Sequence, residues 1–227
     1  MVKMKLSKLD SLITRLYPDL QNLRRDLHRD PELSWKEYRT TNKIRDFLRQ
    51  QGYSDFHQPL DTGLVTETQW ESGRPAIALR ADIDALPIAD AKTTPYASQN
   101  AGVSHACGHD VHTAVMCGVA AVLQQLGGEM GINARFLFQP AEEPIPSGAP
   151  QFIKKGVLDG IDHILGMHVE PELKLGQVSV TEGWVNAQSI RLEWQFLGEG
   201  GHSARPQQTA NPIDAASMLM SRMQSLA

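Results

Sequence analysis

Residues 76–84 have the sequence AIALRADID, an apolar run that ends in two carboxylates. The run has the length of a strand, and its continuous apolar character is typical of a strand buried on both faces. Two later segments repeat this arrangement, since ARFLFQ precedes Glu142 and Glu143, and HILGM precedes His168. We therefore predict three buried strands, each followed by side chains that are able to do chemistry.

Helical and strand patterns alternate along most of the chain. They predict, in order, helix 7–29, helix 35–51, strand 63–67, strand 75–81, helix 110–126 and strand 133–138. This alternation indicates an α/β fold in which a largely parallel sheet is flanked by helices. Open sheets of this kind bind ligands beyond the carboxyl ends of their strands, so the polar strand ends mark the expected site.

Two later segments depart from the alternation. Residues 144–150, PIPSGAP, predict a loop, because three prolines within seven residues are incompatible with a helix or an inner strand. Further along, four apolar residues alternate with polar ones: Ile190, Leu192, Trp194 and Phe196. A period of two is typical of a strand with one face in water.

The change of pattern predicts two domains, a larger one of residues 1–181 and the start of a smaller α+β domain in residues 182–227. The smaller part includes a predicted helix with Asn211 as its N-cap and Pro212 at its first position. One or two strands and one helix cannot bury their own apolar faces. We therefore expect this part to borrow surface from a partner or to continue in a longer chain.

The composition excludes several classes of protein. The 227 residues carry a net charge of −4 with scattered Lys and Arg, so we expect no nucleic-acid partner. No apolar run approaches the roughly 20 residues that span a bilayer, and the charged start lacks the apolar core of a signal peptide. Cys107 and Cys117 are too few for a disulfide framework, so we expect a cytoplasmic protein without membrane association.

The strongest chemical signal is Cys107-Gly108-His109, a thiol and an imidazole two positions apart in a predicted loop. Cysteine, histidine and carboxylate side chains are ligands of zinc and related metals. On its own the segment is as typical of a helix start capped by Asp110 as it is of a metal site. Together with the acidic strand ends and His168, it predicts a metal site.

The adjacent residues Glu142 and Glu143 fit two roles. Neighbouring side chains at a strand end point in different directions, so one carboxylate can bind metal while the other takes a proton from water. An exposed acidic loop is the plain alternative. Asp82 or Asp84 is expected to accept the second ring N–H of a ligating histidine. A nucleophilic Cys107 is the competing enzyme hypothesis, but it leaves both glutamates unused.

The other histidines have weaker support. His105 and His112 fit an orienting, a substrate-contacting or a structural role, and we expect neither to bind metal. His28, His57 and His163 have no supporting context, so we expect them to be surface or packing residues.

Five segments of the sequence resemble a known family. They are LRRDLHRDPELS at 23–34, LRADIDALP at 79–87, HACGHDVH at 105–112, FQPAEE at 138–143 and GMH at 166–168. In order and content they resemble the M20 metallopeptidase superfamily, in the amidohydrolase branch. That branch includes hippurate hydrolases, indole-acetyl-amino-acid hydrolases and N-acyl-amino-acid deacylases. The resemblance covers essentially the whole chain.

The resemblance implies a zinc-peptidase-like catalytic domain followed by a dimerisation or lid domain. It also implies two divalent metal ions, which are zinc, manganese, cobalt or nickel. The implied ligands are Cys107, which bridges the ions, His109, Glu143 and His168. Glu142 is the implied general base, and Asp84 the residue that orients a ligand.

The implied reaction is attack of metal-activated water on the amide bond of an N-acyl or N-aroyl amino acid. His202, in the segment GGHSARP at 200–206, resembles a histidine that reaches the active site of a partner subunit and steadies the oxyanion. We therefore expect a homodimer in the full-length form. A dipeptidase or aminopeptidase of the same superfamily is the alternative activity.

Two departures from the family bear on these expectations. Family members are longer, and their later residues complete the sheet and supply one last metal-binding histidine. We therefore expect this chain to be poorly active, or to be an inactive fragment that at most binds metal or a partner. The prolines of residues 144–150 replace glycines of many members and are expected to alter the rim of the pocket.

Overall fold

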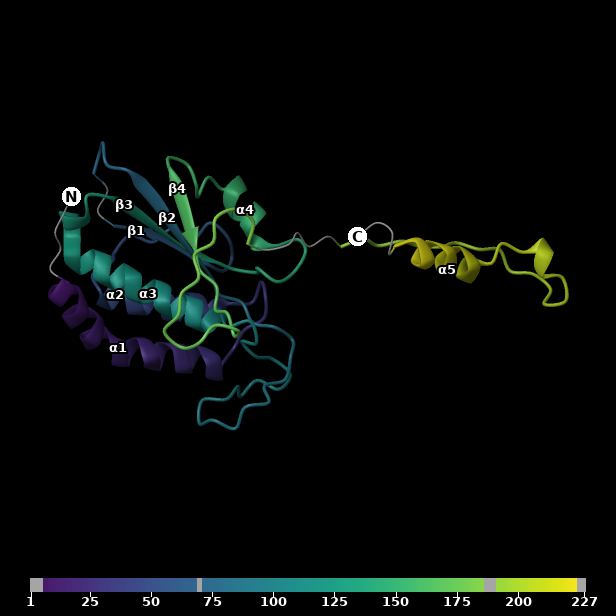
Figure 1. Cartoon of the computed structure of the whole chain (residues 1–227), viewed down its shortest axis with the longest axis horizontal. Helices are drawn as coiled ribbons and strands as arrows, with labels where there is room; N and C mark the ends of the chain where they lie inside the picture. The colour runs from purple at the N-terminus through teal and green to yellow at the C-terminus, as the bar shows by residue number, and fades with distance from the viewer. Residues whose placement is uncertain (1–5, 69–70, 186–190, 224–227) are drawn as a thin grey trace. The chain divides into compact units, whose positions relative to one another are not determined.

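The computed structural model describes residues 6–68, 71–185 and 191–223. The chain divides into two compact units, unit 1 at Met1–Val178 and unit 2 at Ser179–Ala227. Unit 1 contains a sheet covered by helices, and the described part of unit 2 contains one α-helix (Figure 1).

The sheet of unit 1 has four strands in the order β1-β3-β2-β4. Their bounds are β1 Leu64–Glu67, β2 Ala76–Asp82, β3 Asn133–Gln139 and β4 His163–Gly166. β2 is parallel to both of its neighbours, whereas β1 is antiparallel to β3. Asp82 pairs with Gln139 and Arg80 with Gly166, so β2, β3 and β4 end at one edge of the sheet. The predicted α/β fold with a largely parallel sheet is confirmed.

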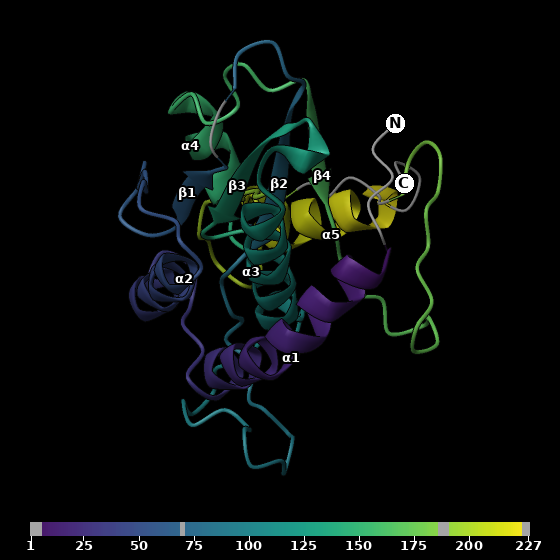
Figure 2. The ribbon, with the colours of Figure 1, turned by 90° about the vertical axis from the view of Figure 1, so that its left-hand side faces the viewer.

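Helices cover both faces of the sheet (Figure 2). They are α1 Leu6–Arg29, α2 Tyr38–Gln50 and α3 His109–Leu126 on one face, and α4 Gly148–Lys154 on the other. In β3, Phe136 and Phe138 pack in the core with α1, α2 and α3, whereas Leu137 packs with Phe152 of α4. Apolar cover on both faces explains the continuous apolar run of this strand. The described helices include none with the length and apolar character that a membrane crossing requires.

The structure corrects three of the predicted elements. Pro150 lies in the first turn of α4, where its missing N–H would have no intrahelical partner, so the loop predicted over 144–150 is wrong for its last residues. β4 is exposed rather than buried, because it lies at the edge of the sheet. α2 begins at Tyr38 rather than near residue 35, because Trp35 has a left-handed φ of 66°.

Unit 2 holds α5, Pro212–Met223, and a short 3₁₀ helix, η2, Pro206–Gln208. Oδ1 of Asn211 accepts the N–H of Ile213 at 3.1 Å, so the predicted start of this helix is confirmed. The strand predicted from Leu192, Trp194 and Phe196 is not formed in the described residues, and Ile190 lies outside them. Alternation defines two faces, but a strand also needs a hydrogen-bonded neighbour.

Candidate metal centre

The candidate site lies where the carboxyl ends of β2, β3 and β4 approach the start of α3. The turn after β3 carries Glu142 and Glu143, and the segment after β4 carries His168. α3 begins at His109, two positions after Cys107. Asp84 follows the end of β2 by two residues. Four segments that are distant in the sequence therefore meet at one edge of the sheet.

Gly108 permits the close approach of two of these segments. Its φ is 84°, in the left-handed region that favours glycine. A Cβ at this position would lie 2.4 Å from Cγ2 of Val169, which is closer than real side chains come. Only glycine therefore lets the start of α3 lie against the segment that carries His168.

The distances place His109 at the centre of the cluster. Sγ of Cys107 lies 3.3 Å from Nε2 of His168. Nε2 of His109 lies 3.8 Å from Oε1 of Glu143 and 4.0 Å from Oε2 of Glu142. Potential ligand atoms of Cys107, His109 and His168 lie within 4.8 Å of one another, and the same holds for the group of His109 and the two glutamates. The structure thus brings together all four residues expected as ligands and the expected base.

The unpaired atoms of the cluster fit a metal ion. Nδ1 of His109 donates to Asp84, at 3.0 Å from its backbone oxygen and 3.2 Å from Oδ1. Nε2 of His109 is buried without a hydrogen-bond partner, and so is Oε1 of Glu143. A buried polar atom left unpaired costs about 1–3 kcal/mol, which a cation between these atoms would relieve. Thiol, imidazole and carboxylate together form a donor set for zinc and similar metals.

Asp84 is an ionised carboxylate that fixes two parts of the site. Burial works to raise its pKa, but hydrogen bonds from His109, Ser34 and the Glu143 backbone lower the pKa to about 2. Its Oδ2 accepts the Ser34 hydroxyl at 2.7 Å and the N–H of Glu143 at 3.1 Å. Burial works to lower the pKa of His109, yet Asp84 and Asp82 raise that pKa above its ordinary value.

His112 uses both ring nitrogens inside the protein. Nδ1 donates to Oδ1 of Asp82 at 2.6 Å, and Nε2 accepts the N–H of Val169 at 2.9 Å. Asp82, His109 and His112 also form a group with ligand spacing. Because these bonds occupy His112, the structural role fits it best, and it holds the residue next to His168.

The surroundings of Cys107 favour metal ligation over nucleophilic attack. Burial, together with the charges of Glu143 and Glu142, raises the pKa of this thiol to about 12. A thiol with such a pKa is protonated at neutral pH and is a weak nucleophile. A bound cation reverses this preference, because it stabilises the thiolate.

Sequence reasoning missed a buried network beside the site. His28 is 1% exposed, and its Nδ1 lies 2.6 Å from Oδ2 of Asp110. Nε of Arg24 lies 2.9 Å from the same oxygen. Of the two expected alternatives, a surface or a packing residue, His28 is therefore a packing residue, and it holds the residue that follows His109. His105 is also buried, and burial lowers its pKa to about 4. No pattern of residue types near His28 indicates its contact with Asp110, because the two residues are 82 positions apart in the sequence.

The remaining histidines are two residues of unit 1 and one of unit 2. His57 and His163 are exposed, as expected for surface residues. His202 belongs to unit 2, where it is exposed and its Nδ1 accepts the N–H of Ala204 at 3.1 Å. Its role in a partner subunit stays a prediction.

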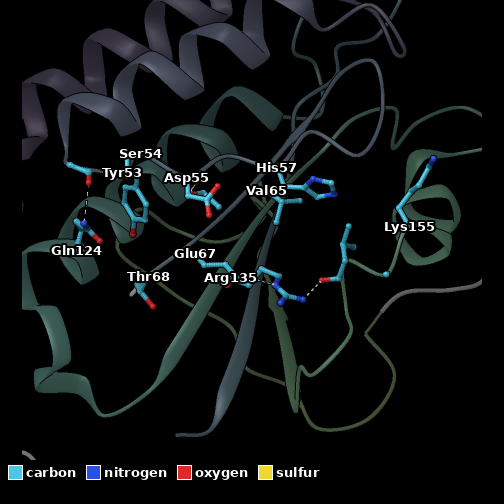
Figure 3. A pocket seen from close by; sticks show the side chains of 14 residues that line it. Tyr53, Ser54, Asp55, His57, Val65, Glu67, Thr68, Gln124, Arg135 and Lys155 are labelled. Atoms are coloured by element: carbon cyan, nitrogen blue, oxygen red, sulfur yellow. Dashed lines mark hydrogen bonds and ion pairs between the residues drawn. The ribbon is translucent and has the colours of Figure 1, made fainter. Parts of the chain in front are cut away.

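A cavity of about 560 Å³ lies elsewhere on unit 1, beside β1, and its lining includes none of the candidate site residues (Figure 3). Nε of Arg135 donates to Oε1 of Glu67 at 2.5 Å, and Nη1 donates to the backbone oxygen of Val157 at 2.7 Å. In the part of the chain that the structure describes, none of the buried side-chain atoms without a partner belongs to this lining. The cavity therefore gives no indication of a ligand.

Comparisons with known proteins agree with the geometry of the cluster. The sequence profile described as Peptidase family M20/M25/M40 matches residues 78–224. N-acetylcysteine deacetylase of Bacillus subtilis is 45% identical over 208 residues, which are 91% of this chain and 54% of that protein. N-acyl-L-amino acid amidohydrolase of Geobacillus stearothermophilus is 36% identical over 215 residues, which are 95% of this chain and 58% of that protein.

A solved structure is also similar to this chain. The crystal structure of a dinuclear metal-binding peptidase of the M20 family from Bacillus subtilis matches with a TM-score of 0.70 and 45% identity. The match covers 77% of this chain and 48% of that one. The chain thus spans about half the length of the relatives it matches.

Proposed function

The chain belongs to peptidase family M20/M25/M40, and from this membership we propose that it carries the metal site of an amidohydrolase for N-acyl or N-aroyl amino acids. One observation carries the proposal: Nε2 of His109 and Oε1 of Glu143 are buried 3.8 Å apart, and neither is hydrogen bonded. Cys107 and His168 lie beside them. The names of the two curated relatives, a deacetylase of N-acetylcysteine and an N-acyl-amino-acid amidohydrolase, support the substrate class.

We assign two divalent cations to this site, with zinc, manganese, cobalt and nickel as the candidates. Cys107 would bridge the pair, and His109, Glu143 and His168 would be further ligands. The dinuclear relative supports the number of ions. When bound, such ions polarise the substrate carbonyl and make water a better nucleophile.

The two glutamates have different proposed roles, Glu143 as a metal ligand and Glu142 as the general base. The side chain of Glu143 is 24% exposed and its Oε1 is unpaired, which suits a ligand. The side chain of Glu142 is 39% exposed, so it can take a proton from water and pass it to the leaving amine. Asp84 keeps the proton of His109 on Nδ1, which leaves the Nε2 lone pair for the metal.

The wider organisation is proposed on sequence evidence. Residues 1–181 form the catalytic domain, and residues 182–227 begin a dimerisation or lid domain, as the change of pattern after residue 180 supports. In a homodimer, His202 stabilises the developing oxyanion in the partner's site. A cytoplasmic location is supported by the low cysteine content.

Metal content tests the proposal. Wild-type protein and the variants Cys107→Ala, Glu143→Ala and Glu142→Gln are loaded with zinc, manganese or cobalt, and each is measured by elemental analysis. We expect the first two variants to lose metal, because affinity depends on a full ligand set, and Glu142→Gln to retain it. Unchanged metal content in both ligand variants would contradict the proposal.

Turnover tests the substrate class and the base. Hippurate, N-acetyl amino acids, indole-acetyl conjugates and free dipeptides are assayed with each metal. Given the poor activity expected from the sequence, we expect slow hydrolysis that is confined to the N-acyl compounds. Glu142→Gln should lose about 10²–10⁴-fold of this activity at unchanged metal content. Hydrolysis of free dipeptides alone would favour a dipeptidase or aminopeptidase.

A further inference from the structure

Glu37 is a fully buried carboxylate outside the set of residues proposed to bind metal or move protons. It immediately precedes α2, whereas the turn that carries Glu142 and Glu143 follows β3. We infer that Glu37 is a positioning residue that holds the backbone of this turn and thereby directs both glutamates toward the site. The inference rests on the roles proposed above for Glu142 and Glu143.

The carboxylate of Glu37 has one partner in the turn and one beside β1. Its Oε1 accepts the N–H of Ala141 at 2.7 Å, and its Oε2 accepts the hydroxyl of Thr62 at 2.7 Å. Its backbone oxygen accepts the N–H and the hydroxyl of Thr41, at 2.9 Å and 2.6 Å, which ties it to α2. Burial raises the pKa of Glu37. Burying a carboxyl group is unfavourable, and these hydrogen bonds offset the cost.

Ala141 needs such a partner, because its backbone is strained. Its φ of 50° lies in the left-handed region, which is unfavourable for a residue with a Cβ. Its oxygen accepts the N–H of Gly148 at 2.7 Å. A side chain at Gly148 would bring its Cβ to 2.0 Å from the backbone oxygen of Pro140. Both polar backbone groups of Ala141 are therefore held, the N–H by Glu37 and the oxygen by Gly148.

The position of the two glutamates depends on this residue. Glu142 follows Ala141 directly, and the N–H of Glu143 is held by Oδ2 of Asp84 at 3.1 Å. If Ala141 relaxes to an ordinary φ, the direction of the chain at Glu142 changes. The N–H of Glu143 is then displaced from Oδ2 of Asp84, and their hydrogen bond is strained or lost. A displacement of about 1 Å is enough to change a site's activity on the order of 100-fold. The hydrogen bond from Ala141 to Glu37 thus helps to set the positions of the Glu142 and Glu143 side chains.

Cobalt binding tests the inference, because the sulfur-to-cobalt absorption band reports on Cys107 and the titration gives the affinity. We expect Glu37→Ala to bind Co²⁺ about 10- to 100-fold more weakly than the wild type. Glu37→Gln should stay within about threefold, because its amide oxygen still accepts from Ala141 and its NH₂ donates to Thr62. Thr41→Val is the matched control. It removes two buried hydrogen bonds, one to the backbone oxygen of Glu37 and one from the N–H of Gly63, but neither bond of the Glu37 carboxylate. It should therefore lower the melting temperature but not the affinity.

A second variant separates strain from general destabilisation. Adding Ala141→Gly to Glu37→Ala should restore most of the Co²⁺ affinity, because glycine adopts a φ of 50° without the bond. A purely structural role of Glu37 predicts no such recovery. If Glu37→Ala does not fold, Glu37→Met takes its place, since it fills a similar volume without an acceptor.

Wild-type Co²⁺ affinity in Glu37→Ala or Glu37→Met would overturn the inference, and so would an equal loss of affinity in Thr41→Val. A wild-type protein without the sulfur-to-cobalt band would instead overturn the proposed metal site. In that case, hydrogen exchange of the Ala141 amide decides the remaining question: Glu37 holds the turn only if Glu37→Ala exchanges this amide faster than the wild type and Thr41→Val do.

Discussion

Replacing Asp84 with asparagine keeps the shape of the side chain and removes its charge. In the wild type, Oδ1 accepts from Nδ1 of His109, and Oδ2 accepts from Ser34 and from the backbone of Glu143. If the single oxygen of asparagine stays with Ser34 and Glu143, its NH₂ group faces His109. The backbone oxygen of residue 84 still accepts from Nδ1 of His109 at 3.0 Å, but the NH₂ group now opposes a proton on that nitrogen. The preference of His109 for the Nδ1–H tautomer therefore weakens, and more of the protein carries the proton on Nε2, the nitrogen proposed to bind metal.

The expected loss of stability follows from the pKa of Asp84, which is about 2 in the folded protein against an ordinary value of 3.8. This difference corresponds to roughly 2–3 kcal/mol of stabilisation by the charged form. Because the folded pKa is the lower one, the stabilisation is complete above about pH 5 and disappears as the pH falls toward 2. We expect Asp84→Asn to lower the free energy of unfolding by about 2 kcal/mol at pH 7, and by about half as much at pH 3.

Urea unfolding of the metal-free protein, followed by circular dichroism at pH 7 and pH 3, measures this difference. Asp61→Asn is the control, because Asp61 is exposed and its replacement should change stability by no more than about 0.5 kcal/mol. Cobalt titration should show affinity reduced by about 10- to 100-fold in Asp84→Asn. Equal stability losses at the two pH values, or Co²⁺ binding as tight as that of the wild type, would refute this account of Asp84.

Two further predictions concern the start and the middle of α3. Gly108→Ala should destabilise unit 1 by about 1–3 kcal/mol in thermal unfolding and lower its metal content, because the new Cβ would meet Val169; an unchanged melting temperature would contradict this. In the native metal-free protein at pH 8, both thiols should react slowly with a disulfide reagent, because the pKa of Cys107 is raised to about 12 and Cys117 is fully buried. Both thiols should react quickly in urea. If Cys107 of the native protein reacts as fast as free cysteine, burial and the neighbouring glutamates do not raise its pKa as described.

The sequence predicts those parts of the fold that local patterns control. α3 ends at Leu126 as predicted, because Gly127 and Gly128 follow it. β3 matches its prediction because an apolar run between polar ends is typical of an inner strand. β4 has a similar run but is exposed, since a pattern of residue types does not reveal what covers a strand. The loop predicted as far as Pro150 was wrong for a related reason: a proline is excluded from the interior of a helix but not from its first turn.

The candidate site was predictable where it depends on topology. Parallel neighbouring strands end at one edge, so the residues after β2, β3 and β4 had to meet there. The residues that hold this cluster were not predictable, because their partners are distant in the sequence and backbone atoms are often involved. Glu37 and Ala141 are 104 positions apart, and neither residue type marks the contact.

Residues from the last turn of α1 to the residue before α2 anchor three of the four segments that form the site. The bonds are His28 to Asp110 at 2.6 Å, Ser34 to Asp84 at 2.7 Å and Glu37 to Ala141 at 2.7 Å. The fourth segment, which carries His168, is held by His112 through Val169. Residues 28–37 contain none of the proposed metal ligands. The bonds from His28 and Glu37 end within two positions of a proposed ligand or base. The bond from Ser34 ends on Asp84, which itself contacts His109 and the N–H of Glu143. The motif at 23–34 therefore has a physical reason that its residue types do not reveal, because part of it fixes the ligand-bearing segments relative to one another before any metal binds.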